Sequence, residues 1–388
     1  MIRDLFQFGG DATPELLALA DRTQLSLQFR GRPNLPEWFA AEIETRHARN
    51  QVRRGQLRTA YAEIAAQLTA EGVEFVLLKG FTHETGFGIE ASNRIQYDLD
   101  FWVAATDLTR AQALIEGLGY VSHGEQSLSD EHSRPLVRPS NWRWHGDYFD
   151  TEMPIQIELH DTLWSNAKDR IAAPGLEDFW PRCRVVEVNG LQIPALCEHD
   201  RMAFAALHAL RHILRHDARP AHVHELACLL AIRVHDEAFW EAWRELYNPR
   251  LKALQTMAFR FAQEWFDGPW PEALEEEWRG VSRSVTAWFE QFAWSPAENI
   301  SRPNKDTVWL HVALTDSLRD RVRVFIDRLL PPRMPHHDET PYAARLGARL
   351  RYHAAAFAPA LASGFRWWWR RDTPSTASHT SDWKRRSV

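Results

Sequence analysis

The amino-acid sequence predicts an α+β fold in which a small mixed β-sheet lies between two helical regions. Segments 73–78, 97–101 and 155–160 have the apolar or alternating pattern of β-strands. The chain before residue 73 and the chain after residue 200 instead carry apolar residues at helical spacing. Short strands flanked by helices at both ends are typical of the α+β class.

The helical segments are recognised by apolar residues three and four positions apart, bounded by proline or glycine. Pro33 and Pro36 separate the first two helices, and Gly119 ends the helix that follows the second strand. We expect helices at 12–27, at 36–71, at 107–118 and, with breaks, from about 200 to 330.

The strand segments alternate between apolar and polar residues or are apolar throughout. The dipeptide Asn189-Gly190 is a strong hairpin signal, because both residues readily adopt the backbone of a tight turn. We expect strands at 73–78, 97–101, 155–160, 184–188 and 191–194, and an edge strand near 147–150 within a long loop.

These patterns divide the chain into five predicted regions. They are an N-terminal helical segment (1–72), a sheet-containing core (73–200), a helical domain (201–330), a linker with a C-terminal helix (331–371) and a tail (372–388) expected to be disordered.

Composition excludes several classes of protein. The net charge of the 388 residues is −6, which argues against bulk binding of nucleic acid by a global basic field. The three cysteines form no CxxC motif, and the first residues lack the pattern of a signal peptide. No apolar run approaches the roughly 20 residues that span a bilayer. We therefore expect a cytoplasmic protein without a transmembrane segment.

Two aspartates and a glutamate are the strongest candidates for a chemical site. Asp98 and Asp100 are two residues apart on one strand, so their side chains point to the same face. Glu158 lies on the polar face of the segment 155–160, and it joins the aspartates if that strand pairs beside theirs. Carboxylates held this close repel each other unless a cation lies between them, and Mg²⁺ or Mn²⁺ suits oxygen ligands. The alternative is a solvated edge strand, which alternation alone would favour.

The turn after the first strand supplies candidate phosphate ligands. Gly80 would let backbone amides approach a phosphate closely, and Lys79 would add a positive charge. Arg94 precedes Asp98 by four residues, and its guanidinium can bind a phosphate with two hydrogen bonds or pair with a nearby acid. The alternatives are an ordinary strand-ending glycine and a solvated lysine.

The ordered set of these motifs resembles a known family. The chain is similar to uncharacterised bacterial nucleotidyltransferases of the DNA polymerase β-like superfamily, from the helix before residue 73 to about residue 332. It departs from the wider superfamily by having Lys79-Gly80 where Gly-Ser is usual, and Glu225 where Asp is expected. The matching elements are Leu78-Lys79-Gly80, Arg94-x-x-x-Asp98-x-Asp100, Leu118-Gly119-Tyr120, Ile157-Glu158-Leu159-His160, Leu207-His208 with His212, and the segment 225–230.

The resemblance implies an enzyme that transfers a nucleoside monophosphate from a nucleoside triphosphate, expected to be ATP, to an acceptor hydroxyl. The acceptor is open, and a small molecule, peptide, protein or RNA all fit. The alternative function is a catalytically silent protein that binds a nucleotide or a partner on the same fold. The implied roles are Asp98, Asp100 and Glu158 for catalysis and metal binding, Lys79, Gly80 and Arg94 for the nucleotide, and His160, His208 and Glu225 for the acceptor side.

Some candidate residues also have simpler interpretations. His160 can be a hydrogen-bonded structural histidine, and Glu225 can be a surface residue or a charge at a helix N-terminus. His208, His212 and His216 are spaced four apart on a predicted helix, which is a spacing that can bind zinc. Because the HExxH glutamate is replaced by Ala209, we expect a packing or pocket role for these histidines instead.

Overall fold

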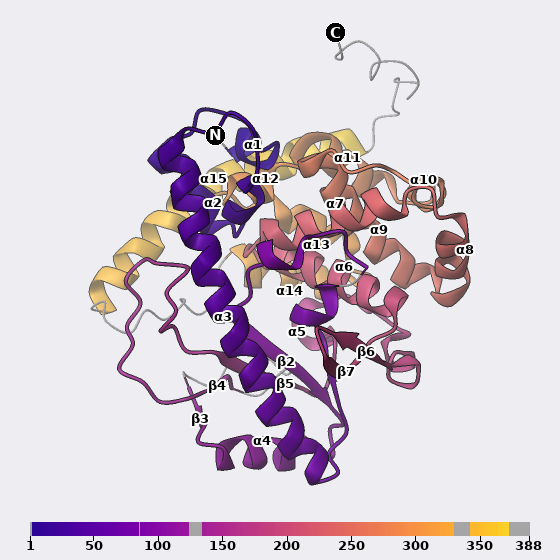
Figure 1. The fold of residues 1–388 in the computed structure, drawn as a ribbon. Helices are drawn as coiled ribbons and strands as arrows, with labels where there is room; N and C mark the ends of the chain where they lie inside the picture. The colour runs from indigo at the N-terminus through magenta and orange to yellow at the C-terminus, as the bar shows by residue number, and fades with distance from the viewer. Residues whose placement is uncertain (1, 85, 124–133, 330–341, 372–388) are drawn as a thin grey trace. The chain divides into compact units, whose positions relative to one another are not determined.

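The structure is a computed structural model that describes residues 2–84, 86–123, 134–329 and 342–371 (Figure 1). It contains two compact units, Met1–Arg279 and Gly280–Val388. The predicted linker residues 331–341 and the predicted tail 372–388 lie outside the described residues. The five-part division stays a prediction.

Within the described residues of the first unit, seven strands form one mixed sheet in the order β3-β4-β5-β2-β1-β7-β6. The central strand β2 pairs parallel with β5 and antiparallel with β1, and β1 pairs parallel with β7. This confirms the predicted α+β class with a mixed sheet. The strands are β1 (Phe75–Leu77), β2 (Asp98–Val103), β3 (Val121–Ser122), β4 (Leu136–Val137), β5 (Gln156–His160), β6 (Arg184–Val188) and β7 (Leu191–Ala195).

Alternation along β2 and β5 divides the sheet into an apolar and a polar face. Leu99, Phe101, Ile157 and Leu159 are fully buried in one core cluster. The long helix α3 (Glu37–Ala70) and α4 (Leu108–Gly117) add their own apolar residues to that cluster, and Figure 1 shows α3 running across the sheet. Because successive strand residues point to opposite faces, the carboxylates of β2 and β5 lie on the other side of the sheet.

The hairpin predicted at Asn189-Gly190 is present, but the edge strand predicted in the long loop is not. Asn189 and Gly190 join β6 to β7 with φ angles of 50° and 80°, which is the left-handed backbone that this dipeptide accepts. The edge strand expected at 147–150 is wrong, since those residues form no strand. Strand β4 lies at Leu136–Val137 instead; both residues are buried, and Leu136 pairs with Ile157 of β5.

The remaining elements of the first unit are mainly helices that follow the sheet. Helix α6 is buried along most of its length and packs against α7 and α9. The helices not yet named are α1 (Ile2–Phe6), α2 (Pro14–Arg22), α5 (Asn166–Asp169), α6 (Glu198–Leu214), α7 (Pro220–Arg233), α8 (Glu237–Leu246), α9 (Pro249–Phe266) and α10 (Glu272–Arg279). Short 3-10 helices lie at Ser26–Phe29, Gly80–Glu84, Ala91–Asn93, Leu176–Asp178 and Trp180–Arg182.

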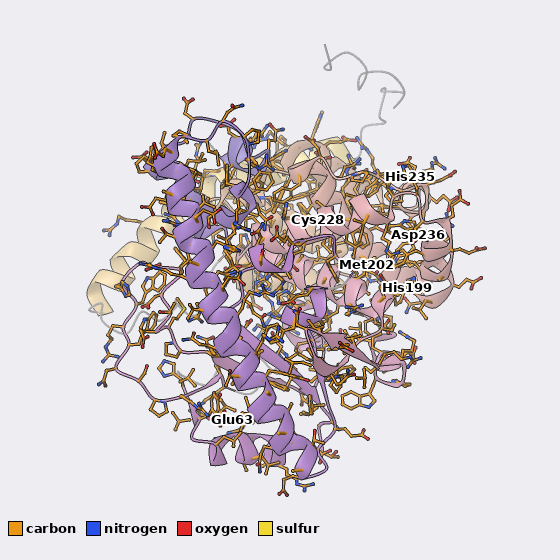
Figure 2. All side chains as sticks on the ribbon, viewed as in Figure 1. Glu63, His199, Met202, Cys228, His235 and Asp236 are labelled. Atoms are coloured by element: carbon orange, nitrogen blue, oxygen red, sulfur yellow. The ribbon has the colours of Figure 1, made fainter. Side chains whose placement is uncertain are left out.

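All three cysteines of the chain are in the first unit and are free. Cys228 lies on α7, and Figure 2 shows it among the helices that follow the sheet. Burial raises the pKa of the Cys228 thiol to about 12, so this thiol is protonated at neutral pH. The absence of a disulfide framework agrees with the sequence.

The second unit consists of helices in its described part. Tryptophan side chains hold these helices together: Trp288 Nε1 donates to Asp306 O at 2.8 Å, and Trp367 Nε1 donates to Ser284 O at 2.7 Å. Within the described residues, no helix of either unit is long and apolar enough to cross a membrane. The helices are α11 (Arg283–Phe292), α12 (Ser295–Glu298), α13 (Thr307–Leu314), α14 (Leu318–Leu329) and α15 (Tyr342–Arg371).

Candidate active site

The register of β2 and β5 brings the predicted carboxylates together. Asp100 pairs with Glu158 across the two parallel strands, and Asp98 lies two residues earlier on the same face as Asp100. Asp100 is buried, while the side chain of Glu158 is 19% exposed. The expected neighbourhood of the three residues is therefore present. Their roles in catalysis stay predictions.

A lysine ammonium lies between the carboxylates. Lys79 Nζ is 3.1 Å from Asp100 Oδ2 and 3.8 Å from Asp98 Oδ2. Lys79 reaches this position because it follows β1, whose neighbour Leu78 donates its backbone N–H to Asp100 O at 3.1 Å. Lys79 is thus a partner of the carboxylates in this structure, and its predicted contact with a phosphate stays a prediction.

Gly80 is required by the backbone and by close packing. Its φ angle is +71°, and a Cβ atom there would overlap the side-chain amide of Gln96. That amide in turn donates to the carbonyl of Asp98 at 2.7 Å. Gly80 therefore lets the turn approach the start of the strand that carries the aspartates.

His160 extends the carboxylate group on β5. Its Nε2 is 3.0 Å from Asp100 Oδ1 and 3.7 Å from Glu158 Oε2. One ligand atom from each of Asp100, Glu158 and His160 lies within 4.8 Å of the others, which is a spacing compatible with a shared cation. A role for His160 on the acceptor side is not visible in these contacts and stays a prediction.

The protonation equilibria of the three carboxylates differ, because the favourable contacts outweigh burial and mutual repulsion only at Asp100. Burial, together with the nearby Asp100 and Asp98, raises the pKa of Glu158 to about 7, and burial raises that of Asp98 as well. Burial also opposes ionisation of Asp100, but Lys79 and His160 outweigh it and hold its pKa below the usual range. Burial alone would lower the pKa of Lys79, but the surrounding carboxylates outweigh burial and raise it.

A second charged cluster contains two predicted site residues, Arg94 and Glu225. Arg94 Nε is 2.9 Å from Glu225 Oε1, and His83 Nδ1 is 2.9 Å from Glu225 Oε2. Glu225 is buried on α7, so its interpretation as a surface residue is wrong. Burial opposes its ionisation, but Arg94 and His83 outweigh this and lower its pKa. His83 was missed in the sequence, where a single histidine in a turn gives no distinctive signal.

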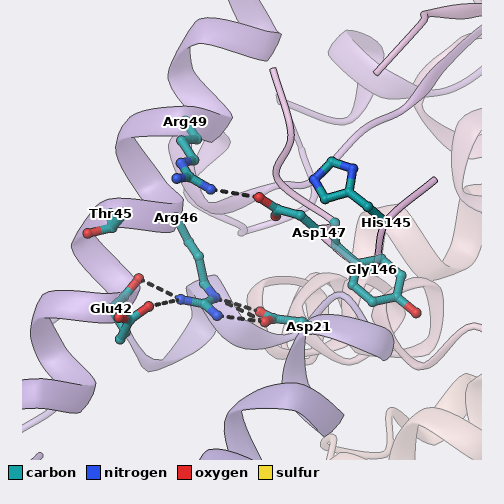
Figure 3. A pocket seen from close by; sticks show the side chains of 9 residues that line it. Asp21, Glu42, Thr45, Arg46, Arg49, His145, Gly146 and Asp147 are labelled. Carbon is teal, nitrogen blue, oxygen red and sulfur yellow. Dashed lines mark hydrogen bonds and ion pairs between the residues drawn. The ribbon is translucent and has the colours of Figure 1, made fainter. Parts of the chain in front are cut away.

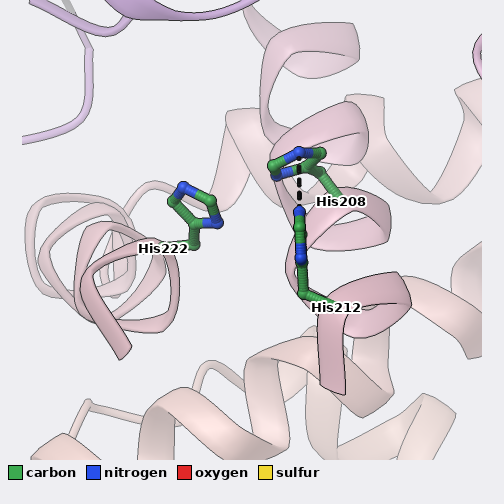
Figure 4. Close-up of side chains that lie close together, drawn as sticks. All are labelled: His208, His212 and His222. Atoms are coloured by element: carbon green, nitrogen blue, oxygen red, sulfur yellow. Dashed lines mark hydrogen bonds between the residues drawn. The ribbon is translucent and has the colours of Figure 1, made fainter. Parts of the chain in front are cut away.

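The histidine stripe expected on one helix is not formed as predicted. Helix α6 ends at Leu214, and His216 follows it in left-handed backbone with a φ angle of 61°. His208 and His212 are instead joined by His222 from the first turn of α7 (Figure 4). Lys79 Nζ is 3.3 Å from His208 Nε2, so the histidines adjoin the carboxylates through this lysine.

A separate polar pocket of about 400 Å³ lies beside α3 (Figure 3). Its arginines already have partners, because Arg46 pairs with Asp21 at 2.9 Å and Arg49 pairs with Asp147 at 2.7 Å. Among the described residues that line it, none is a predicted site residue. This pocket therefore adds nothing to the carboxylate site.

Comparison with known proteins identifies the family. The sequence profile of a family described as "Uncharacterised nucleotidyltransferase" matches residues 15–267, which is well over half of the chain and includes the whole sheet. No curated protein and no solved structure matches the chain. On this match, the chain belongs to that nucleotidyltransferase family and is an enzyme of the nucleotidyltransferase class, whose acceptor is unknown.

Proposed function

We propose that this enzyme transfers a nucleoside monophosphate from a nucleoside triphosphate, ATP in the first instance, to an acceptor hydroxyl. The observation that carries the proposal is the register of Asp100 with Glu158, which places three carboxylates on one face of two parallel strands. We also place the family in the DNA polymerase β-like superfamily. The region 73–200 is then the catalytic core, and α6 and α7 supply residues of the acceptor side.

The donor set fits divalent metal ions with a preference for oxygen. Asp98, Asp100 and Glu158 offer carboxylate oxygens. Burial, followed by repulsion from Asp100 and Asp98, raises the pKa of Glu158 to about 7, and a cation at this site would favour its ionised form. Mg²⁺ or Mn²⁺ held by these three residues would neutralise the charge of the triphosphate during transfer.

The reaction exchanges one phosphorus–oxygen bond for another. The acceptor oxygen forms a bond to the α-phosphorus, the bond between the α- and β-phosphates breaks, and pyrophosphate leaves. Glu158 helps to deprotonate the acceptor hydroxyl by accepting its proton as a general base. His160 holds Asp100 in position through the 3.0 Å contact to Oδ1.

Lys79, Gly80 and Arg94 bind the triphosphate in this proposal. The Lys79 ammonium is within 4 Å of Asp98 and Asp100, so it would also reach phosphate oxygens of a triphosphate bound beside these carboxylates. Gly80 lets the turn pack against Gln96 beside the aspartates, and its backbone amide is the proposed contact to a phosphate. Arg94 contacts Glu225 through Nε, and a phosphate is bound through the two terminal nitrogens of the guanidinium.

The acceptor side is assigned to the residues that face the carboxylates from α6 and α7. His208 is within 3.3 Å of Lys79, and Glu225 holds Arg94, so both lie one contact away from the proposed nucleotide ligands. With His160 on β5, they are the proposed determinants of which acceptor is bound.

Labelled triphosphates test the proposal directly. The purified chain is incubated with each α-³²P-labelled nucleoside triphosphate and Mg²⁺, with and without a host-cell extract, and labelled products are separated. We expect label from one triphosphate to pass to a component of the extract, and the Asp98→Asn variant to transfer none.

Calorimetry separates catalysis from simple binding. We expect the affinity for the triphosphate to fall when the metal is chelated. Equal affinity with and without metal, together with no transfer, would instead support the alternative of a silent nucleotide-binding or partner-binding protein.

A further inference from the structure

The three clustered histidines come from two helices and meet at one point. His208 and His212 are one turn apart on α6, and His222 lies in the first turn of α7 (Figure 4). One ring nitrogen of each lies within 4.8 Å of the others. Burial lowers the pKa of all three, and it brings that of His212 to about 4. All three imidazoles are therefore neutral at pH 7, which is the form that binds metal.

The positions of the ring hydrogens show that His208 and His212 do not form a hydrogen bond with each other. Asp217 accepts from His212 Nδ1 at 3.2 Å, so the hydrogen of the neutral His212 ring is on Nδ1 and its Nε2 carries a lone pair. Lys79 Nζ only donates, so His208 Nε2 also presents a lone pair to it at 3.3 Å. The two Nε2 atoms are 3.2 Å apart and are both acceptors.

We propose that His208, His212 and His222 bind a zinc ion, and that Asp217 orients His212 for this purpose. Zinc–nitrogen bonds of about 2.0–2.1 Å in a tetrahedron separate two ligand nitrogens by about 3.3 Å, close to the observed 3.2 Å. The buried Nδ1 of His222 has no hydrogen-bond partner among the described residues. A bound metal ion would satisfy this nitrogen without a hydrogen bond. Neutral imidazoles select zinc over magnesium, whose preferred ligands are oxygens.

The contact between Asp217 and His212 is the arrangement that supports many zinc sites. A carboxylate that accepts from the far nitrogen of a ligating histidine fixes the tautomer and the ring orientation. Asp217 is itself held by Arg219 at 3.0 Å, which keeps the carboxylate ionised. The protein thus provides three ligands and one supporting group, and a fourth tetrahedral position stays open to water or to a substrate atom.

Lys79 connects this site to the carboxylates. Its ammonium is 3.1 Å from Asp100 Oδ2 and 3.3 Å from His208 Nε2. Zinc and Lys79 compete for the single lone pair of His208 Nε2, so a bound zinc leaves Lys79 with the carboxylates alone. The inference concerns a metal on α6 and α7, and it stands whether or not the carboxylates transfer a nucleotide.

Cobalt provides a test that does not need a variant. The chain, purified without a histidine tag and freed of metal with a chelator, is titrated with Co²⁺ alone. We expect one Co²⁺ per chain with the strong visible absorption of a tetrahedral nitrogen site, and loss of that absorption when Zn²⁺ is added. Cobalt on carboxylates is octahedral and absorbs weakly. Absence of the strong absorption at equimolar cobalt would overturn the proposal.

Variants then locate the ion. We expect His222→Gln and His212→Gln to abolish the absorption, Asp217→Asn to weaken cobalt binding by about 10–100-fold, and Lys79→Met to strengthen it. Two variants serve as matched controls. His216→Asn replaces a histidine outside the cluster with a residue that accepts its left-handed backbone, and His235→Ala replaces an exposed histidine (Figure 2). Absorption that survives in both glutamine variants and disappears in Asp100→Asn would place the ion on the carboxylates and refute the histidine site. If a variant unfolds, the cobalt titration of the unaltered chain and the Asp217→Asn shift decide.

Discussion

Two charged clusters in the first unit contain buried carboxylates, but their charges are balanced differently. Around Glu225, one carboxylate faces one guanidinium, Arg94, with His83 as a further hydrogen-bond partner. On β2 and β5, three carboxylates share one ammonium, that of Lys79.

The difference is visible in the proton equilibria. The pKa of Glu225 is lowered, because burial is outweighed by its partners, whereas the pKa of Glu158 is raised to about 7. A balanced buried pair is satisfied without a ligand, so the fold should depend on it whether or not Arg94 also contacts a phosphate. An excess of negative charge on a rigid strand pair is costly to the fold and is therefore the better candidate for a cation-dependent site.

The largest effect should come from removing a carboxylate of the unbalanced cluster. We expect Asp98→Asn to lower nucleotidyl transfer by at least about 1,000-fold, because the metal ions lose an anchor while the size of the side chain is kept. The measurement is label transfer per folded protein. Glu63→Gln is the matched control and should keep full activity, since Glu63 pairs with Arg138 at the surface and not with a proposed site residue (Figure 2). Normal activity in folded Asp98→Asn would remove the basis of the enzyme proposal.

Breaking the balanced cluster should act on stability instead. Arg94→Met leaves Glu225 buried without its guanidinium, so we expect a loss of about 3–5 kcal/mol in the free energy of unfolding by urea. Arg138→Met removes one partner of an exposed pair and should cost less than about 1 kcal/mol. If Arg94→Met is as stable as the unaltered chain and only its triphosphate affinity falls, the pair with Glu225 contributes little to the fold and Arg94 acts through the proposed phosphate contact alone.

Asp100 and Glu158 should respond in opposite directions although they are neighbours in register. Asp100→Asn removes charged contacts to Lys79 and His160 and should cost about 2 kcal/mol in metal-free protein. Glu158→Gln removes a charge that the surroundings disfavour, so stability should hold or rise. Urea unfolding in a chelator measures both. Equal losses in the two variants would show that Lys79 serves the whole cluster and not Asp100 in particular.

Much of this geometry follows from the sequence because it depends on local periodicity. The alternation in β2 and β5 fixes which side chains share a face, and the parallel neighbourhood of the two strands then places Glu158 beside Asp100. Repulsion among the carboxylates, and its relief by a cation, follow from the residues alone. The position of the Lys79 ammonium beside Asp100 does not, because it depends on the pairing of β1 with β2.

What the sequence could not provide are contacts between distant segments. His83 and Glu225 are 142 residues apart, so no periodic pattern in the sequence indicates their contact. His222 joins His208 because α7 packs against α6. The expected third histidine, His216, fails for a local reason, since the helix ends before it.

The smallest expected effect is a dependence of stability on pH that Glu158 contributes. Its pKa is about 7 in the folded protein against an ordinary value of 4.5, so between these values the native state binds a proton more tightly than the unfolded chain. The stability that this proton contributes is complete below pH 4.5 and is lost as the pH rises through about 7. In a chelator, we therefore expect the unaltered chain to lose stability relative to Glu158→Gln as the pH rises from about 4.5 to about 7. The buried histidines His208, His212 and His222, whose pKa values are lowered, contribute the opposite slope to both proteins, so the difference between the two proteins is the quantity that reports on Glu158. Asp98, whose pKa is also raised, should account for part of the slope that remains in Glu158→Gln.

Because an ionised Glu158 is the form that binds metal, Mg²⁺ affinity of the unaltered chain should rise over the same range, which calorimetry at several pH values measures. An identical pH profile in the variant would mean that Glu158 is already ionised well below neutrality, and that the cluster is less overcharged than the comparison with Glu225 requires.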